Sequence, residues 1–454
     1  MAAAIGAGDR PANHLADTIC AGAGMVDTSA AASMTGAAAV HFARLAELGA
    51  PFDRTMHRQF LLSREAAHGV ARVVRLGGER AGQAIMTTLI RAVVQASHVH
   101  LVTGLPATDL VVEAGRGVDV VVESADLLAD AGGCGVILAP AVLFAGGGAA
   151  DLYAVTTNPP RIRGQMLGTA AWAGAVIRDA EFIQFHPTAI DIGEDPAPLA
   201  TEALRGEGAV LINALGLRFI LAIAPQAEFA ARDVVTRAVF AEWQAGRRPM
   251  LDTRAAIGAS LPTLFATVHA ACLRAGVGAL TQPIPVTAAA HYHMGGVAVD
   301  PAGRLSVPGL WVAGEAACTG LRGANRLASN GLLKAPVLGR AAAMDIARAV
   351  ALAAGAPVSK VALSGVGLQA DARSVAILRG LMTRHVGVER KASGPAQALA
   401  GLAALDGANP PAFDNMLAAA TLIAAAAHLR RESRGAISGP IFPKWIPDRP
   451  ILRT

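Results

Sequence analysis

Residues 303–350 read GRLSVPGLWVAGEAACTGLRGANRLASNGLLKAPVLGRAAAMDIARAV. Within this stretch, LWVAGE is an apolar run of strand length, and the loop after it is rich in glycine and polar residues. Residues 331–350 have the composition of a helix. A strand, a glycine-rich loop and a helix in this order predict one unit of an α/β nucleotide-binding sheet.

A second strand with a glycine turn is predicted in residues 131–150, AGGCGVILAPAVLFAGGGAA. The stretch carries no charge and has the length of a membrane span, but Pro140 and glycines 146–148 divide it into short apolar pieces. A buried parallel strand fits better, because such strands are apolar on both faces. We therefore predict no membrane span.

The rest of the chain changes character along its length. Residues 87–99 have the pattern of an amphipathic helix, and VHLVTG (99–104) that of a strand. Residues 180–292 are richer in polar side chains, and after a linker, AAGAPVSK (353–360), the chain becomes alanine-rich and helical in pattern. Strands mixed with helices, followed by helices alone, predict an α/β nucleotide domain with an inserted domain and a helical tail.

Composition narrows the class of protein. The 454 residues are 53% hydrophobic and 16% charged, which excludes disorder, and the length predicts two or three domains. The net charge is +5, but the arginines come singly or in pairs, so we expect no nucleic-acid partner. The four cysteines have no CxxC spacing, which argues against a metal site or a disulfide framework. The first residues show no secretory signal, and we expect a cytoplasmic protein.

Five polar clusters interrupt the apolar chain. They are EFIQFHPTA around His186, LATEALRGEGA around Thr201, Glu202 and Arg205, AARDVVTRAV around Arg232, AAHYHMGG around His291, and GEAACTGLRGANRLASNG around Glu315 and Arg326. Each has an ordinary alternative: His186 as a satisfied loop histidine, or Arg232 and Asp233 as a solvated pair. Together they supply the imidazoles and guanidiniums that a site for a small dicarboxylate needs, because arginine binds carboxylates through two N–H groups.

The order and spacing of these motifs resemble the fumarate reductase/succinate dehydrogenase flavoprotein family. The resemblance runs from near residue 1 to about residue 350, with a weaker match at RRESRG (430–435). It implies non-covalent FAD and a Rossmann-like α/β FAD domain, with an inserted α+β capping domain and a C-terminal helical domain. The implied boundaries are 1–179 and 293–352 for the FAD domain, 180–292 for the capping domain and 353–454 for the helical domain.

Within this family, SREAAH (63–68) is similar to the segment of the members that oxidise L-aspartate, in which a glutamate faces the substrate amino group. The succinate and fumarate enzymes typically have a neutral residue there. Aspartate differs from succinate by one amine, and a carboxylate can pair with the ammonium or accept its proton. Glu65 therefore favours aspartate. The alternative is Glu65 paired with Arg64 or Arg72 on a solvated helix.

The resemblance also implies a role for each matching residue. Arg232 would be the general acid/base, with Glu202 and Arg205 in its supporting network. The substrate carboxylates would be held by Arg326 with His291 and by His186 with Thr201. The flavin contacts would be Glu315, Ser329, Asn330, Gly331 and Leu332.

The implied reaction is oxidation of L-aspartate to iminoaspartate, with oxygen or fumarate as the electron acceptor. This is the first step of NAD biosynthesis, and it implies quinolinate synthase as a partner. Two alternatives stay open from the residues. One is a soluble fumarate reductase or succinate-oxidising flavoprotein, and the other is a non-catalytic remnant that binds a dicarboxylate or a partner without FAD.

Four departures from the family pattern concern the flavin. No GxGxxG occurs near the start: AGAGMVD (21–27) has Asp27 in place of the third glycine, so we expect the opening βαβ unit to be absent from this sequence. The usual GDG is Gly164-Gln165-Met166, and the usual SNSLLE ends in Lys334. The usual EGG is Glu65-Ala66-Ala67, which strains the loop if either alanine needs a positive φ. Together these changes predict weakened FAD binding.

Overall fold

The computed structural model describes residues 1–77, 80–113, 117–124, 133–352, 362–364, 370–407 and 409–439. The helices are α1 Pro11–Ala21, α2 Thr28–Glu47, α3 Ala81–Gln95, α4 Gln165–Trp172, α5 Glu202–Gly206, α6 Arg232–Gln244, α7 Leu261–Leu264, α8 Ala266–Arg274, α9 Asn330–Leu352, α10 Ala372–His385, α11 Gly394–Ala403 and α12 Pro411–Leu429. The strands of the central part are β6 Val142–Phe144, β7 Ile177–Arg178, β8 Ile183–Ile190, β9 Val210–Ile212, β10 Met250–Asp252, β11 Ile284–His293, β12 Gly296–Ala298, β13 Leu310–Val312 and β14 Ala317–Cys318. The remaining strands are β1 Leu62–Ser63, β2 Val73–Val74, β3 Ala107–Glu113, β4 Gly117–Ser124, β5 Gly133–Ala139 and β15 Ala362–Ser364.

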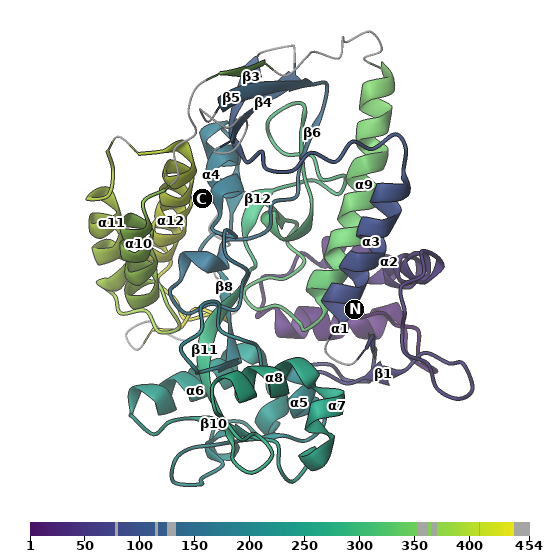
Figure 1. Ribbon diagram of the computed structural model, residues 1–454, viewed down its shortest axis with the longest axis vertical. Coiled ribbons are helices and arrows are strands. Elements are labelled where there is room, and N and C mark those ends of the chain that lie inside the picture. Colours follow the sequence, from purple (N-terminus) through teal and green to yellow (C-terminus); the bar gives the residue numbers. More distant parts are fainter. Residues whose placement is uncertain are drawn as a thin grey trace.

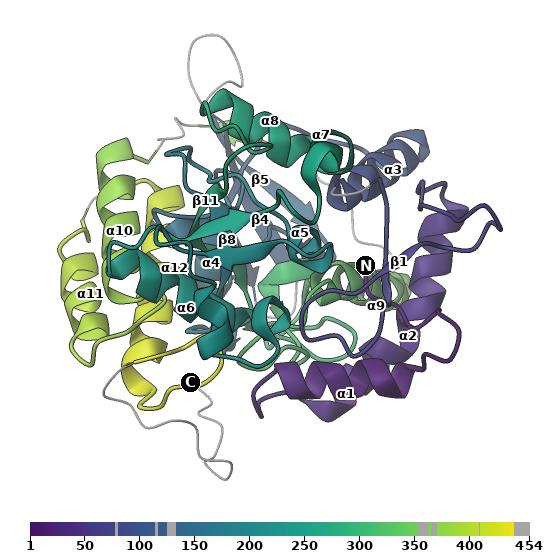
Figure 2. The ribbon, with the colours of Figure 1, turned by 90° about the horizontal axis from the view of Figure 1, so that it is seen from below.

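These elements form three groups around the middle of the molecule (Figure 1). The sheet with strand order β8-β11-β10-β9 lies at one end with α5 to α8. Seen from below, this part lies between α10–α12 on one side and α1–α3 on the other (Figure 2). Strands β8 and β11 are antiparallel, with Ala289 opposite His186 and Tyr292 opposite Gln184. This pairing places two of the polar clusters on neighbouring strands.

The predicted strand LWVAGE is confirmed as β13, which pairs in parallel with β6. Both strands end on glycine turns, at glycines 146–148 and at Gly314, which has φ +71°. The parallel strand with a glycine turn that is predicted within residues 131–150 is confirmed as β6, although the apolar run before it forms another strand, β5. Pro140 separates β5, which pairs antiparallel with β4, from β6, because proline cannot donate to a ladder.

Three further sequence predictions can be compared with the described residues. The helix predicted at 87–99 is α3, which begins and ends earlier. The strand predicted at 99–104 does not form, because no neighbouring strand pairs with it, and Leu101 and Val102 are 67% and 62% exposed. The predicted tail contains the helices α10 to α12, but the prediction of helices alone was wrong at β15 (Ala362–Ser364), which pairs antiparallel with β5. The linker 353–360 lies outside the described residues.

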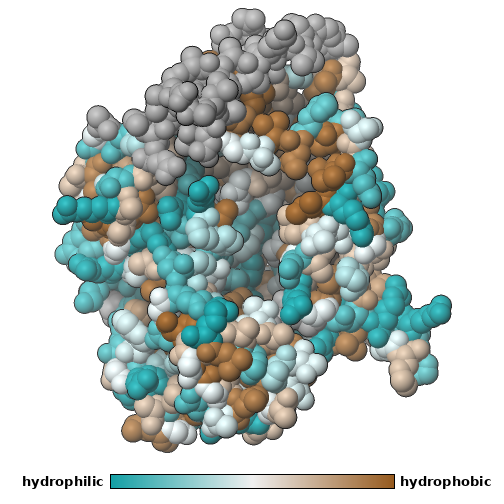
Figure 3. All heavy atoms as spheres, in the orientation of Figure 1, coloured by the Kyte–Doolittle hydropathy of each residue, from teal (hydrophilic) through white to brown (hydrophobic). Residues whose placement is uncertain are grey.

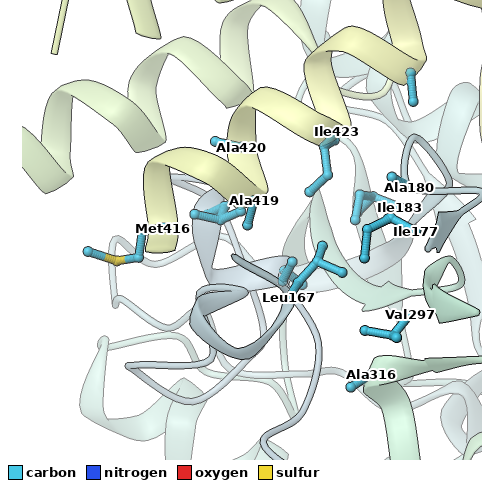
Figure 4. Packing of buried hydrophobic residues seen from close by; sticks show 14 of the residues in the cluster. Leu167, Ile177, Ala180, Ile183, Val297, Ala316, Met416, Ala419, Ala420 and Ile423 are labelled. Atoms are coloured by element: carbon cyan, nitrogen blue, oxygen red, sulfur yellow. The ribbon is translucent and has the colours of Figure 1, made fainter. Parts of the chain in front are cut away.

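The largest core lies where α12 packs on α4 and on the central strands (Figure 4). Ala419, Ala420 and Ile423 of α12 belong to this core together with Leu167 of α4, and Gly168 leaves no room for a Cβ against the backbone of Asn415. By length and composition alone, α12 could cross a membrane, and it is the one helix of the described residues that could. More than half of its apolar window is buried in this core, at 56%.

Candidate functional site

Two histidines face each other across neighbouring strands. His186 on β8 is 1% exposed, and its ring centroid lies 5.0 Å from that of His291 on β11. The Nδ1 atom of His291 lies 2.8 Å from Thr157 Oγ1, and Arg326 Nη2 lies 3.4 Å from its Nε2. A guanidinium only donates, so His291 Nε2 is the acceptor and Nδ1 carries the proton.

Burial lowers the pKa of both imidazoles well below the usual value. For His186 the next causes are Arg232 and His291, and for His291 they are Arg326 and Arg232. Cations on several sides therefore hold both rings neutral at physiological pH. Neutral imidazoles add hydrogen-bonding capacity to the site without adding fixed charge.

Beside these histidines, Arg232, Glu202 and Arg205 form a buried chain of charges. Arg232 begins α6, and its Nε donates to Glu202 Oε2 at 2.7 Å, with a second hydrogen bond from Nη2. The other oxygen of Glu202 lies 3.4 Å from Arg205 Nη2. Burial acts to raise the pKa of Glu202, but Arg232 and Arg205 outweigh it and hold that pKa below its ordinary value. Thr201 caps α5, accepting from the Ala203 N–H, and so fixes the start of the helix that carries Glu202 and Arg205.

Gln184 joins this chain of charges to the loop of Arg326. Its Oε1 accepts from Arg232 Nη1 at 3.2 Å, and its Nε2 donates to Asn325 Oδ1 and to the Arg326 carbonyl, both at 2.9 Å. Gln184 lies in the sequence motif around His186 but was not predicted as a site residue. Gln184 lies two residues before His186, so both side chains are on the same face of β8. This two-residue period of a strand could have predicted Gln184 as a site residue.

Arg326 and Arg322 both lie on the ring of Tyr292. Their guanidinium carbons are 4.1 Å and 4.2 Å from the ring centroid. Burial, followed by Arg232, lowers the pKa of Arg326 to about 9. The Nε atoms of both arginines are buried and have no hydrogen-bond partner among the described residues. A Cβ at Gly331 would lie 2.8 Å from Arg326 Nη1, so the glycine leaves room for this arginine.

Glu65 lies on another side of the Arg232–Glu202 pair. Its Oε2 accepts from Ser329 Oγ at 2.9 Å, and both residues line a cavity of about 420 Å³ together with Thr201 and Leu332. Burial, followed by Glu202, raises the pKa of Glu65, while Arg232 opposes the rise. These influences place Glu65 within electrostatic range of the Arg232–Glu202 pair.

The ordinary alternatives for these residues are wrong. Arg72 pairs with Asp9 and Asp17 and leaves Glu65 to Ser329, in a turn and not on a helix. Asp233 pairs with Arg237 at 3.0 Å, while Arg232 turns inward to Glu202. His186 lies within a buried strand and not in a loop.

The residues expected to contact a flavin lie at the ends of parallel strands and at the start of α9. Glu315 follows β13, and its Oε1 accepts from the His293 N–H at 2.8 Å, while Gly148 after β6 leaves no room for a Cβ beside it. In open α/β sheets, ligands bind at the carboxyl ends of strands. The start of α9 supplies the free N–H groups that every helix N-terminus has. The Asn330 side chain instead turns away to His14 and Thr18.

This donor set fits a flavin dinucleotide. Buried guanidinium N–H groups and the first turn of α9 suit its anionic and carbonyl oxygens, and the Glu315 carboxylate suits a hydroxyl. On the face seen in Figure 3, the surface is hollowed between the side of α10–α12 and the side of α9. The residues that would hold FAD are Glu315 and Ser329 to Leu332.

The departures from the family pattern have different consequences. Ala67 has φ +62° and Ala66 does not have a positive φ, so the predicted strain falls on one alanine. Asp27 caps α2 by accepting from the Ala30 N–H at 2.9 Å. Gln165 Oε1 accepts from the Arg163 N–H at 3.0 Å at the start of α4.

Lys334 is the most unusual of these replacements. It is 1% exposed and donates to the Ala317 carbonyl. Burial, followed by Arg322, lowers its pKa well below the usual value.

In the parts of the chain that the structure describes, no group of three or more His, Cys, Asp or Glu side chains could hold a metal ion.

The sequence matches a family model described as an FAD binding domain over residues 1–332. L-aspartate oxidase of Caulobacter vibrioides is 49% identical over 454 residues, covering 98% of this chain and 85% of the relative. L-aspartate oxidase of Xylella fastidiosa is 41% identical over 453 residues, with coverages of 98% and 83%.

Solved structures show the same fold at lower identity. A quinol–fumarate reductase with menaquinol molecules has a TM-score of 0.86 at 24% identity, covering 96% of this chain and 84% of that chain. A variant of the E. coli quinol fumarate reductase FrdA has a TM-score of 0.82 at 23% identity, with coverages of 98% and 84%. At this identity the likeness concerns the fold, which is that of fumarate reductase flavoproteins.

Proposed function

This chain belongs to the L-aspartate oxidase family of flavoproteins with an FAD binding domain, and from this membership we propose that it oxidises L-aspartate to iminoaspartate. It is a flavin oxidoreductase, and FAD is its cofactor. When bound, FAD supplies the acceptor for the hydride that leaves the substrate.

The observation that carries the proposal is the buried grouping of Arg326, Arg232 and Arg205, in which Arg232 and Arg205 pair with the Glu202 carboxylate. Burial and Glu202 raise the pKa of the neighbouring Glu65, and the two histidines stay neutral, so the guanidiniums outnumber the ionised carboxylate of Glu202. A buried excess of this sign favours a small dianion. The two carboxylates of aspartate satisfy that requirement.

Substrate orientation follows from the directions of these groups. We assign Arg326 and His291 to one carboxylate, because the 3.4 Å contact between them brings both to the same point. His291 donates to the substrate in its Nε2-protonated tautomer, in which the Thr157 hydroxyl donates to Nδ1. His186 and Thr201 hold the other carboxylate in this assignment. With both ends fixed, the Cα–H bond is held in one direction, and fixed orientation is itself a large part of catalysis.

We propose Arg232 as the general acid/base near the reacting carbons, which donates a proton to a substrate carbon when fumarate is the electron acceptor. Glu202 and Arg205 form its supporting network, and the proton of the aspartate amine goes to Glu65. A guanidinium ordinarily stays protonated at physiological pH. Direct contact with the Glu202 carboxylate gives its proton a nearby acceptor, so exchange between the two needs no rearrangement. Gln184 holds the free side of Arg232 in place.

Glu65 is assigned to the substrate amino group. Its raised pKa suits a group that accepts a proton from the ammonium, because proton transfer is most efficient when the two pKa values approach the working pH. The amine is the only group that distinguishes aspartate from succinate, so Glu65 is the residue that selects the substrate.

The finer parts of the proposal follow from the family. We propose oxygen or fumarate as the electron acceptor, a role at the first step of NAD biosynthesis, delivery of the product to quinolinate synthase, and a cytoplasmic location. We also propose the FAD domain as 1–179 with 293–352, the capping domain as 180–292 and the helical domain as 353–454.

Anaerobic spectroscopy of the 454-residue chain with FAD tests the proposal. L-aspartate should bleach the visible absorbance of the oxidised flavin, while succinate should not. Bleaching by succinate at a similar rate would favour a succinate-oxidising flavoprotein. Absence of bleaching by either compound, with the flavin shown to be bound, would contradict the proposed oxidation.

A further inference from the structure

The turn that begins α9 contains a strained residue that is not glycine. Ser329 has φ +62°, a left-handed conformation in which the Cβ of an L-residue approaches the backbone too closely. Such conformations persist where surrounding groups hold them, and they cluster at ligand sites. Ser329 is followed directly by the first residue of α9, Asn330.

Groups on both sides of Ser329 hold this turn. His68 Nε2 lies 3.0 Å from the Ala328 carbonyl, and His14 Nε2 lies 2.8 Å from Asn330 Oδ1. Ser329 itself donates to Glu65. The turn is therefore fixed before, at and after the strained residue, and two of the three contacts come from histidines.

The direction of each hydrogen bond follows from its partners. Asn330 Nδ2 donates to Thr18 Oγ1 at 3.1 Å, and the Thr18 hydroxyl proton goes to the His14 carbonyl at 2.8 Å. Oδ1 of Asn330 is then an acceptor, and His14 Nε2 must carry a proton. His68 Nε2 also faces a carbonyl, which only accepts, so it carries a proton as well.

Both histidines are neutral for a geometric reason. His14 Nδ1 is buried and has no partner among the described residues, and a proton there would be an unpaired buried donor. His68 Nδ1 lies 3.4 Å from Arg72 Nη1, which donates, so a proton on that nitrogen would face a cation. Burial is the first cause that lowers the pKa of each histidine to about 4.

Arg72 is itself held in place by two carboxylates. It is 1% exposed, and its Nε and Nη2 donate to Asp9 at 2.9 Å and 3.1 Å, with a further hydrogen bond to Asp17. The His14 and His68 rings lie 6.1 Å apart. His14 and His68 are therefore held in place by α1 and the segment that follows β1.

We propose that His14 and His68 are positioning residues for FAD, which hold residues 328–330 so that the first N–H groups of α9 are aimed at the flavin. This rests on the proposed function, in which Ser329 to Leu332 contact the flavin. The two histidines touch neither substrate nor cofactor and act through the turn.

Two measurements on the full 454-residue chain test the proposal. Hydrogen exchange without FAD reports on the turn itself, and a fluorescence titration with FAD reports on cofactor affinity. His14→Phe and His68→Phe remove the Nε2 donor while filling the space. Each should speed exchange in the peptide that covers residues 327–335 and weaken FAD binding roughly tenfold, since a lost buried hydrogen bond is commonly a change of about that size.

Matched variants separate a lost donor from general damage. His14→Gln and His68→Gln keep an N–H donor at a similar reach and should restore both readouts to within about threefold of the parent. His98→Phe, at an exposed histidine, should change neither. If a phenylalanine variant fails to fold, His14→Ala or His68→Ala, which removes the donor without adding bulk, replaces it in both measurements and is compared with the glutamine variant.

The outcomes distinguish the two proposals. Unchanged hydrogen exchange at residues 327–335 in both phenylalanine variants would overturn the proposal that the two histidines hold residues 328–330. Faster exchange with unchanged FAD affinity would show that the turn does not serve the flavin, and would overturn the positioning role. A parent chain that binds no FAD would contradict the flavin contacts of the proposed function. The hydrogen-exchange measurement would still show whether the two histidines hold residues 328–330.

Discussion

The Glu65 carboxylate accepts a hydrogen bond from the Ser329 hydroxyl at 2.9 Å, across 264 positions of the sequence. This contact joins the residue assigned to the substrate amine with the turn assigned to the flavin. Substrate selection and cofactor binding therefore share one border of the cavity.

Glu65→Gln should reduce aspartate oxidation far more than fumarate reduction. A charge-assisted contact is worth about 1.5–3 kcal/mol, or roughly 10- to 150-fold in rate. Steady-state kinetics with both substrates measures the ratio. Glu207→Gln is the matched control, because Glu207 lines the same cavity but pairs with Arg75 at the surface. Equal losses in the two reactions would remove Glu65 from substrate selection.

Glu202→Gln should destabilise the protein and abolish turnover. The change leaves Arg232 and Arg205 buried without their carboxylate, and breaking a buried pair commonly costs about 3–5 kcal/mol. Urea unfolding and aspartate turnover are the measurements. Asp233→Asn, which breaks the partly exposed pair with Arg237, should cost about 1 kcal/mol or less. A Glu202 variant as stable as the Asp233 variant would contradict the buried network.

Ala67→Gly should stabilise the chain by about 0.5–1 kcal/mol. Its φ of +62° costs an alanine about 1–2 kcal/mol, and glycine avoids this at a smaller entropic cost in the unfolded chain. Ala66→Gly is the control. Ala66 is buried and lacks a positive φ, so this variant should be less stable than the parent. Thermal unfolding of both variants gives the signs, and a lower Tm for Ala67→Gly would refute the strain.

Stability should fall steeply as the pH drops from about 6.5 towards 4. Burial lowers the pKa of His14, His68 and His293 to about 4 from 6.5, so the unfolded chain binds these protons first. Stability from the neutral rings is fully present above 6.5 and is lost as the pH approaches 4. These three protons contribute a slope of about 4 kcal/mol per pH unit, to which the lowered pKa values of His186 and His291 add. Urea unfolding at several pH values measures the slope, and His68→Gln should lower it by about 1.4 kcal/mol per pH unit.

The sequence by itself determined the family, the strand–loop–helix around residues 310–350 and the helices of the tail. The family rests on the resemblance of the ordered polar motifs, and the other two rest on local pattern: an apolar run, a glycine-rich turn, a helical composition. It also identified the polar clusters, because charged residues are rare enough in this chain to stand out. Local pattern failed at residues 99–104, where a strand-like run found no partner strand.

Only the tertiary structure decided which partner each polar residue takes. Arg232 lies next to Asp233 in sequence yet pairs with Glu202, and Glu65 lies next to Arg64 yet bonds to Ser329. Gln184, His14 and His68 gain their importance in the same way, from contacts across strands and between α1 and α9. A buried polar group must find its hydrogen bond wherever the fold brings a partner, and that partner is set by the packing of distant segments and not by the neighbouring residues.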